Sequence, residues 1–121
     1  IWDLPYFPHS HEKIDANAVT KTVGGSGANT ASWLAKLGHK VILVGAVGDD
    51  EDSRWIVQKI KNQGIKTDLI THTRSHTVNH AISLISNDSK RIIRQRNLDL
   101  TKLNWNDTKL KKMLNGTLLD L

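Results

Sequence analysis

The sequence contains no cysteine, only two prolines and few aromatic residues. Without cysteine the chain has neither disulfide bonds nor thiolate chemistry, so its composition does not require an oxidising compartment. No apolar run approaches the ~18 residues that a membrane-spanning helix needs, and no signal-peptide pattern is present. The lack of a signal-peptide pattern favours a cytoplasmic protein, and the lack of a long apolar run leads us to expect no membrane partner.

Charged residues make up 24% of the chain and low-complexity tracts are absent, which argues against disorder. The 121 residues suit one domain or a piece of a larger one. The chain starts at Ile1 instead of methionine, and residues 117–121 resemble the first part of a buried strand. We therefore expect a truncated chain.

The net charge of +5 comes largely from two basic clusters: Lys90, Arg91, Arg94 and Arg96, then Lys109, Lys111 and Lys112. Clustered cations can neutralise nucleic-acid phosphates. However, isoleucines interrupt the first cluster as in a partly exposed strand, and an apolar stripe accompanies the second as on a surface helix. This pattern argues against nucleic acid as a partner, and a non-catalytic basic binding module stays as an alternative.

The first half of the chain predicts alternating strands and helices. Prolines limit residues 1–12 to a short edge strand, and residues 14–23 alternate as in a half-exposed strand. Residues 28–37 are good helix formers, with small residues and Leu34 on the packing face, and Gly38 follows as a left-handed cap. Residues 41–47 are continuously apolar, which predicts a strand buried on both faces.

The second half continues this order. Asp49 or Asp50 can cap a helix that ends at Gly64, and residues 65–72 form the next strand. Residues 78–86 and 91–96 flank Asn-Asp-Ser, which predicts an antiparallel hairpin. A short helix over 106–114 precedes the last, severed strand. The predicted fold class is α/β, a mostly parallel sheet with flanking helices and a small antiparallel annex.

The most informative segment is Gly24-Gly25-Ser26-Gly27-Ala28-Asn29-Thr30-Ala31, at a strand-to-helix turn. Glycines there allow positive φ and uncover backbone N–H groups beside the positive end of a helix. Asn29 is a mediocre helix former, but its amide offers donors and an acceptor that suit adjacent hydroxyl groups. The dinucleotide fingerprint fails, because Thr30 stands at the third glycine position. Taken alone, the motif fits a tight corner as well as a ligand site.

This segment, with the motifs that follow it, resembles the first signature of the ribokinase-like (PfkB) family. The matching positions are Gly24-Gly25-x-Gly27-Ala28-Asn29-x-Ala31, Leu34-Ala35-x-Leu37-Gly38 and Gly45-x-Val47-Gly48-Asp49-Asp50. The likeness extends back to Pro8 and Glu12, similar to the family's Pro-x-Pro-Gly-Glu lid segment, from which Ser10 and His11 depart. It extends forward to the strand that contains Thr77, so that it covers nearly the whole chain.

The resemblance implies the N-terminal part of a ribokinase-like fold. A small β lid would comprise residues of about 1–23 and 77–97, and an α/β core those of about 24–76 and 98–121. The family transfers the γ-phosphoryl group of ATP, with Mg²⁺, to a hydroxyl of a small sugar or nucleoside. The resemblance also suggests a homodimer of the full-length protein through the lid.

Carried over by position, Gly25 and Asn29 match residues that contact the acceptor sugar, and Gly24-Gly25 matches the hinge between core and lid. The Gly-Asp of residues 48–49 matches a motif that looks structural. The family's Gly-Ala-Gly-Asp segment, with the catalytic base and anion hole, does not occur in these 121 residues. We therefore expect no catalytic residue here, no bound cofactor and no kinase activity of this chain alone.

Two further predictions concern the lid strand. Phosphofructokinase-like members place an arginine after the threonine matched by Thr77 to hold an existing phosphate; Val78 stands there, although nearby Arg74 keeps a phosphosugar kinase open. Strand alternation predicts that His80 faces the acceptor sugar, with a solvated strand residue as the alternative.

The histidines do not predict a metal site. His9 and His11 are close in sequence, and His72, His76 and His80 have helical spacing. The second set falls in predicted strand and turn, where this spacing does not converge, and a credible carboxylate partner is missing.

Overall fold

The computed structural model describes residues 1–74, 76–97, 100 and 111–112. The predicted helix over 106–114 and strand over 117–121 lie outside the described residues, apart from Lys111 and Lys112, which are helical. The chain forms two compact units: unit 1 is Ile1–Val23 with Asn79–Arg96, and unit 2 is Gly24–Val78 with Asn97–Leu121. In the described part of the chain, no helix has the length and apolar character to span a membrane.

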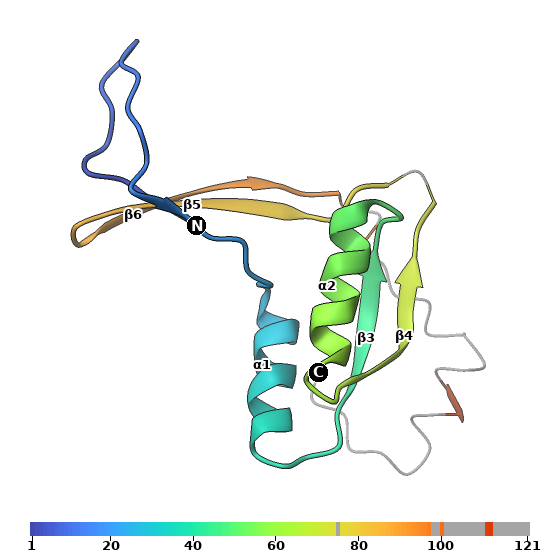
Figure 1. Ribbon diagram of the computed structural model, residues 1–121. Coiled ribbons are helices and arrows are strands. Elements are labelled where there is room, and N and C mark those ends of the chain that lie inside the picture. Colours follow the sequence, from blue (N-terminus) through green and yellow to red (C-terminus); the bar gives the residue numbers. More distant parts are fainter. Residues whose placement is uncertain (75, 98–99, 101–110, 113–121) are drawn as a thin grey trace. The chain divides into compact units, whose positions relative to one another are not determined.

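Unit 1 is a four-stranded sheet in the order β2-β1-β5-β6 (Figure 1). Its strands are β1 (Trp2–Asp3), β2 (Ala18–Val19), β5 (His80–Ser86) and β6 (Ser89–Gln95). β1 runs parallel to β5, whereas the other two pairings are antiparallel. The prediction of an edge strand at the start of the chain is wrong, because β1 is paired on both sides. Both prolines follow this short strand, so neither removes a donor from its ladder.

The hairpin of β5 and β6 confirms the antiparallel prediction. Its pairs run from His80↔Gln95 to Ser86↔Ser89, so both strands start two residues away from the predicted positions. Asn87 in the connecting turn has a positive φ of 49°. Asparagine tolerates this left-handed region better than most residues, which explains why the turn could be predicted from sequence.

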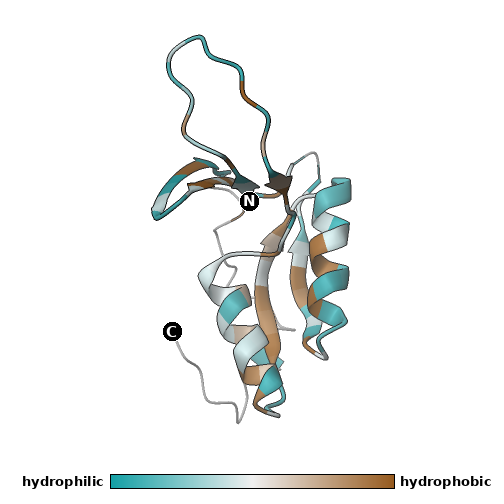
Figure 2. Cartoon of the chain, turned by 60° about the vertical axis from the view of Figure 1, so that its left-hand side comes forward, coloured by the Kyte–Doolittle hydropathy of each residue, from teal (hydrophilic) through white to brown (hydrophobic). Residues whose placement is uncertain are grey.

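In its described residues, unit 2 contains α1 (Ser26–Lys36), β3 (Ile42–Val47), α2 (Glu51–Lys61) and β4 (Lys66–His72). β3 and β4 pair in parallel, with α2 as the crossover between them, and α1 contacts β3 while α2 contacts β4 (Figure 1). The strands are largely hydrophobic, and the helices carry both hydrophobic and hydrophilic faces (Figure 2). This strand–helix–strand arrangement confirms the α/β class.

The core of unit 2 is less extensive than the sequence predicts. Val47, Ile60 and Ile65 are buried, but Ile42 to Ala46 are half-buried instead of covered on both faces. Helix α1 approaches β3 through its small residues, because Ala31 is buried and a Cβ on Gly27 would lie 3.9 Å from Leu43. The larger side chains of α1 therefore stay outside: Leu34, predicted on the packing face, is 39% exposed, and Trp33 is 65% exposed.

Candidate functional site

The glycine-rich turn leads directly into α1. Gly25 is the N-cap residue, with φ 98° and ψ 142°, a combination that is essentially restricted to glycine. A Cβ on Gly24 or Gly25 would meet no atom within 4 Å. The glycine at position 25 is therefore required by the backbone conformation and not by crowding, and both residues are exposed to solvent.

Among the residues that the structure describes, no side chain caps the N-terminus of α1. No side-chain hydrogen bond caps it, and its first turn contains no acidic residue. The Asn29 N–H donates to the Gly25 carbonyl oxygen at 2.9 Å, which leaves the preceding helical N–H groups without an acceptor in the helix. The Asn29 side chain is exposed on the same turn. Backbone donors, a partial positive charge and a side-chain amide are thus presented together.

The predicted site residues fall in both units. Gly24, Gly25 and Asn29 are brought together in unit 2 by the turn and the first turn of α1. His80 is the first residue of β5 in unit 1, and alternation along the strand places it on the same face as Ile82. Its role toward an acceptor stays a prediction.

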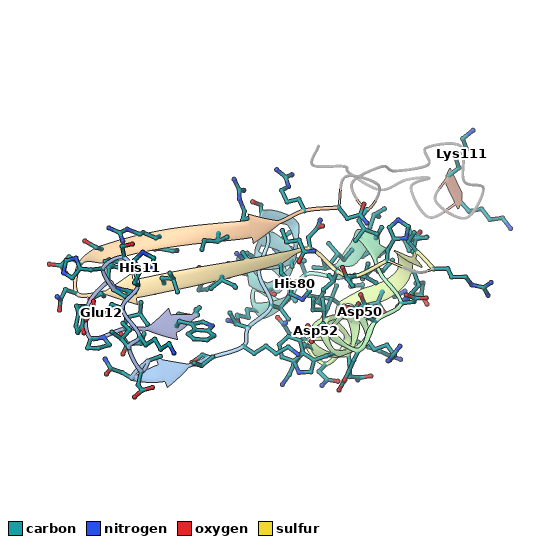
Figure 3. All side chains as sticks on the ribbon, turned by 90° about the horizontal axis from the view of Figure 1, so that it is seen from above. His11, Glu12, Asp50, Asp52, His80 and Lys111 are labelled. Carbon is teal, nitrogen blue, oxygen red and sulfur yellow. The ribbon has the colours of Figure 1, made fainter. Side chains whose placement is uncertain are left out.

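The N-terminus of α2 carries a cap of its own. Asp49 and Asp50 were both predicted as candidates to cap this helix, and Asp50 is the N-cap residue. Its carboxylate accepts hydrogen bonds from the Ser53 N–H at 3.1 Å and from the Ser53 hydroxyl. The hydroxyl, with help from the N–H groups of Ser53 and Val78, holds the pKa of Asp50 below its usual 3.8, although partial burial opposes the shift. Figure 3 shows Asp50 and Asp52 at this end of α2.

Sequence reasoning missed the partner of the Gly48-Asp49-Asp50 turn. The Asp49 N–H donates to the His76 carbonyl oxygen at 3.1 Å, and any Cβ on Gly48 would collide with that carbonyl group. The motif was predicted as a helix-capping turn, which it is. Its contact with residue 76 joins segments distant in the chain, and no local pattern signals it.

The loop between β1 and β2 is organised around Glu12. Its carboxylate accepts from the Tyr6 hydroxyl at 2.6 Å and from the His9 N–H at 2.9 Å. The Tyr6 hydrogen bond lowers the pKa of Glu12 below 4.5, and the same bond raises the pKa of Tyr6 above 10.0. His11, which departs from the family's glycine, has a positive φ of 63°. The backbone therefore keeps the conformation that a glycine would favour.

In the first basic cluster, Lys90, Arg91 and Arg94 lie in β6, which is exposed over its whole length, and Arg96 follows the strand. Within it, the Arg91 guanidinium lies 4.0 Å from the centroid of the Phe7 ring. This cation–π contact gives Arg91 a role in holding the β1–β2 loop.

Comparison with known proteins gives consistent matches. The family model for pfkB family carbohydrate kinases matches residues 3–116. The ribokinase of Bacillus subtilis is 34% identical over 97 residues, which are 78% of this chain and 33% of that protein. The 5-dehydro-2-deoxygluconokinase of Geobacillus thermodenitrificans is 48% identical over 59 residues, which are 49% of this chain and 18% of the relative.

Solved structures match as well. The Arabidopsis thaliana ribokinase in complex with ribose and ATP aligns with a TM-score of 0.68 at 26% identity, over 78% of this chain and 31% of that one. The present chain therefore spans about a third of the length of the ribokinases that it matches. The predicted fold, a part of the ribokinase-like architecture, is confirmed.

Proposed function

Because the chain belongs to the pfkB family of carbohydrate kinases, we propose that it supplies the acceptor-binding turn of an ATP-dependent kinase that phosphorylates a hydroxyl of a small sugar. The matched relatives named ribokinase and 5-dehydro-2-deoxygluconokinase support a sugar acceptor over a nucleoside. Unit 1 would serve as the lid and unit 2 as part of the core.

The observation that carries the proposal is the open N-terminus of α1. Gly25 leaves the turn without a side chain, and in the described part of the chain no side-chain hydrogen bond caps the helix. Helical N–H groups without an intrahelical acceptor can donate to hydroxyl oxygens, while the exposed Asn29 amide can both donate and accept. A neutral polyhydroxylated ligand needs this mixture of donors and acceptors.

Phosphoryl transfer needs groups beyond those of this turn. Catalysis rests on positioning and on stabilising the charge of the transferring phosphoryl group. The Gly-Ala-Gly-Asp segment that holds the base and anion hole in the resembling family is not found in the 121 residues. We therefore propose that ATP and Mg²⁺ are bound by other parts of the full-length protein. The chain alone should be inactive.

The test is acceptor kinetics of the full-length protein with Asn29→Ala. We expect kcat/KM for the sugar to fall about 10- to 100-fold, the effect of one or two lost polar contacts. The matched control is Thr30→Ala, next to Asn29 and also exposed, which should stay near wild type. Both variants should keep the wild-type stability. Equal kinetics of Asn29→Ala and wild type would contradict the placement of the sugar.

A panel of acceptors identifies the substrate class. It contains ribose, 5-dehydro-2-deoxygluconate, a nucleoside and a sugar phosphate, each assayed for ATP-dependent phosphorylation. We expect turnover of an unphosphorylated sugar, because Val78 stands where phosphosugar kinases of the resembling family carry an arginine. Preferred turnover of the sugar phosphate would favour the phosphosugar alternative. Salt-dependent nucleic-acid binding without turnover would favour the basic binding module.

A further inference from the structure

Strand β6 is the open edge of the unit 1 sheet. The strand order β2-β1-β5-β6 leaves β6 paired with β5 on one side, and among the described residues no strand pairs with its other side (Figure 3). All residues of β6 are exposed to solvent. An edge strand directs alternate N–H and C=O groups away from its sheet. The outer side of β6 therefore offers main-chain donors and acceptors to an additional strand.

The backbone of β6 does not obstruct such an addition. Edges are commonly protected by short strands, prolines, bulges or charged side chains. The opposite edge, β2, has only two residues, whereas β6 spans Ser89–Gln95 without proline and pairs with β5 without a register shift. Of these protective features, only charge is present on β6. Charge therefore determines which segment can pair with this edge.

The charges of β6 are all positive, since its sequence contains no acidic residue. Alternation places Lys90, Ile92 and Arg94 on one face of the strand. Arg91 is on the other face, where its guanidinium contacts the Phe7 ring. The Cβ atoms of directly opposed residues on two paired strands lie ~5 Å apart. Carboxylates at alternate positions of an added strand would thus lie beside Lys90 and Arg94.

The same charges argue against a second copy of β6 as the partner. In an antiparallel pair centred on Ile92, Lys90 of each copy would lie opposite Arg94 of the other. Like charges in opposing positions destabilise a pair of strands. Nucleic-acid phosphates would be attracted to the cations, but a sugar-phosphate backbone has no N–H and C=O ladder to match the edge. An acidic polypeptide meets both requirements.

We propose that β6 is a docking edge, to which an extended acidic segment of a polypeptide binds as an additional strand of the unit 1 sheet. Main-chain hydrogen bonds supply the affinity, and Lys90 and Arg94 select carboxylates at alternate positions. Because every group involved belongs to unit 1, this docking goes beyond the proposed function and does not depend on it.

The test uses the full-length protein and end-blocked peptides of the length of β6. The acidic probe alternates glutamate and valine, and the basic probe has lysine in place of glutamate. Two further acidic probes are N-methylated at one or the other set of alternate residues, because an added strand turns only one set of its amides toward the edge. Fluorescence anisotropy measures each affinity, and amide hydrogen exchange of β6 is followed with and without the acidic probe.

We expect the acidic probe to bind about tenfold more tightly than the basic probe, or better. N-methylation of the set that faces β6 should weaken binding on the order of tenfold, whereas N-methylation of the other set should have little effect. The outward amides of β6 should exchange rapidly in the free protein. The acidic probe should slow their exchange, because it supplies the missing acceptors.

The choice of charge is tested by Lys90→Glu combined with Arg94→Glu. Both side chains are exposed, so the variant should fold like the wild type, which circular dichroism checks. It should bind the acidic probe about tenfold more weakly and gain affinity for the basic probe. The matched control is Lys13→Glu combined with Lys40→Glu, which makes the same change in net charge at two exposed lysines outside β6. This control should keep the wild-type affinity, because distant surface charges are screened.

Equal binding of the acidic and basic probes would overturn the proposal, as would equal binding of the parent probe and both N-methylated probes. Outward amides of β6 that are already protected in the free protein would also overturn it, because another segment would then cover the edge. Displacement of the acidic probe by duplex DNA, without protection of β6 by the probe, would replace strand addition by the basic binding module. Absence of sugar phosphorylation would overturn the proposed function and leave these outcomes unaffected.

Discussion

Helices α1 and α2 have the same length but differ in how their N-termini are capped. Helix α1 begins at a glycine with positive φ, has no capping side chain and has no acid in its first turn. Helix α2 begins at Asp50, whose carboxylate caps it, and Glu51 and Asp52 follow in the first turn. Because acidic groups at this end offset the helix dipole, α2 satisfies its own terminus and α1 does not.

Under the proposed function, this difference would separate a structural role of the α2 N-terminus from a binding role of the α1 N-terminus. An uncapped N-terminus is less favourable by about 1 kcal/mol than a capped one, so a sequence that keeps it forgoes stability. A ligand oxygen can replace the missing cap. At α2 the cap is occupied internally, because the Asp50 carboxylate accepts from Ser53.

The largest expected effect comes from Gly48→Ala, at the turn before α2. The new methyl group would overlap the His76 carbonyl, so the turn or residues 76–78 must shift; we expect a loss of about 3 kcal/mol in the free energy of unfolding. Denaturant unfolding measures it. The control is Gly45→Ala in β3, whose Cβ meets nothing within 4 Å. Equal destabilisation by the two variants would show that the close approach is not required.

A smaller effect is expected for Gly25→Ala at the start of α1. Alanine is strained at φ 98° and ψ 142°, so the free energy of unfolding should fall by about 2 kcal/mol. Gly24→Ala is the neighbouring control, since it has equal space and no positive φ. Chemical denaturation of both variants tests this. If Gly25→Ala were as stable as Gly24→Ala, the turn would not depend on its left-handed residue.

A pair of serine substitutions sharpens the comparison of the helices. Ser53→Ala in α2 removes the buried hydroxyl that donates to Asp50, and should cost about 1 kcal/mol. Ser32→Ala in α1 removes a hydroxyl that donates to the Ala28 carbonyl at 2.9 Å, within its own helix. This second change should be near neutral, because alanine is the better helix former. Thermal unfolding of both variants would show whether the Ser53 hydroxyl contributes more to stability than the Ser32 hydroxyl.

The smallest expected effect is the pH dependence of the stability that the Asp50 carboxylate contributes at the start of α2. Because the folded-state pKa of Asp50 lies below 3.8, its contribution is complete above that value and is lost as pH falls through the folded pKa. The difference in unfolding free energy between wild type and Asp50→Asn should therefore be constant near neutral pH and shrink below pH 3.8. A constant difference down to the acid-unfolding region would show that the carboxylate charge contributes nothing.

Much of this arrangement could be predicted because its causes are local. The glycine at position 38 ends α1 with a φ of 87°, and Asn87 turns the hairpin. The resemblance to the family could also be found from the sequence, because the signature residues lie around the Gly24-Gly25 turn. The exposure of Leu34 could not be predicted, because the alternation of small and large residues does not say which side of a helix its neighbour will meet.

The sequence by itself determined the helices, the longer strands, the hairpin turn and the glycine-rich turn, since backbone preferences and caps act between residues close along the chain. Tertiary structure decided that β1 lies inside its sheet, and that Asp50 and not Asp49 caps α2. It also decided that Gly48 faces the His76 carbonyl. These outcomes depend on which distant segments pack together, and short-range sequence patterns do not encode that choice.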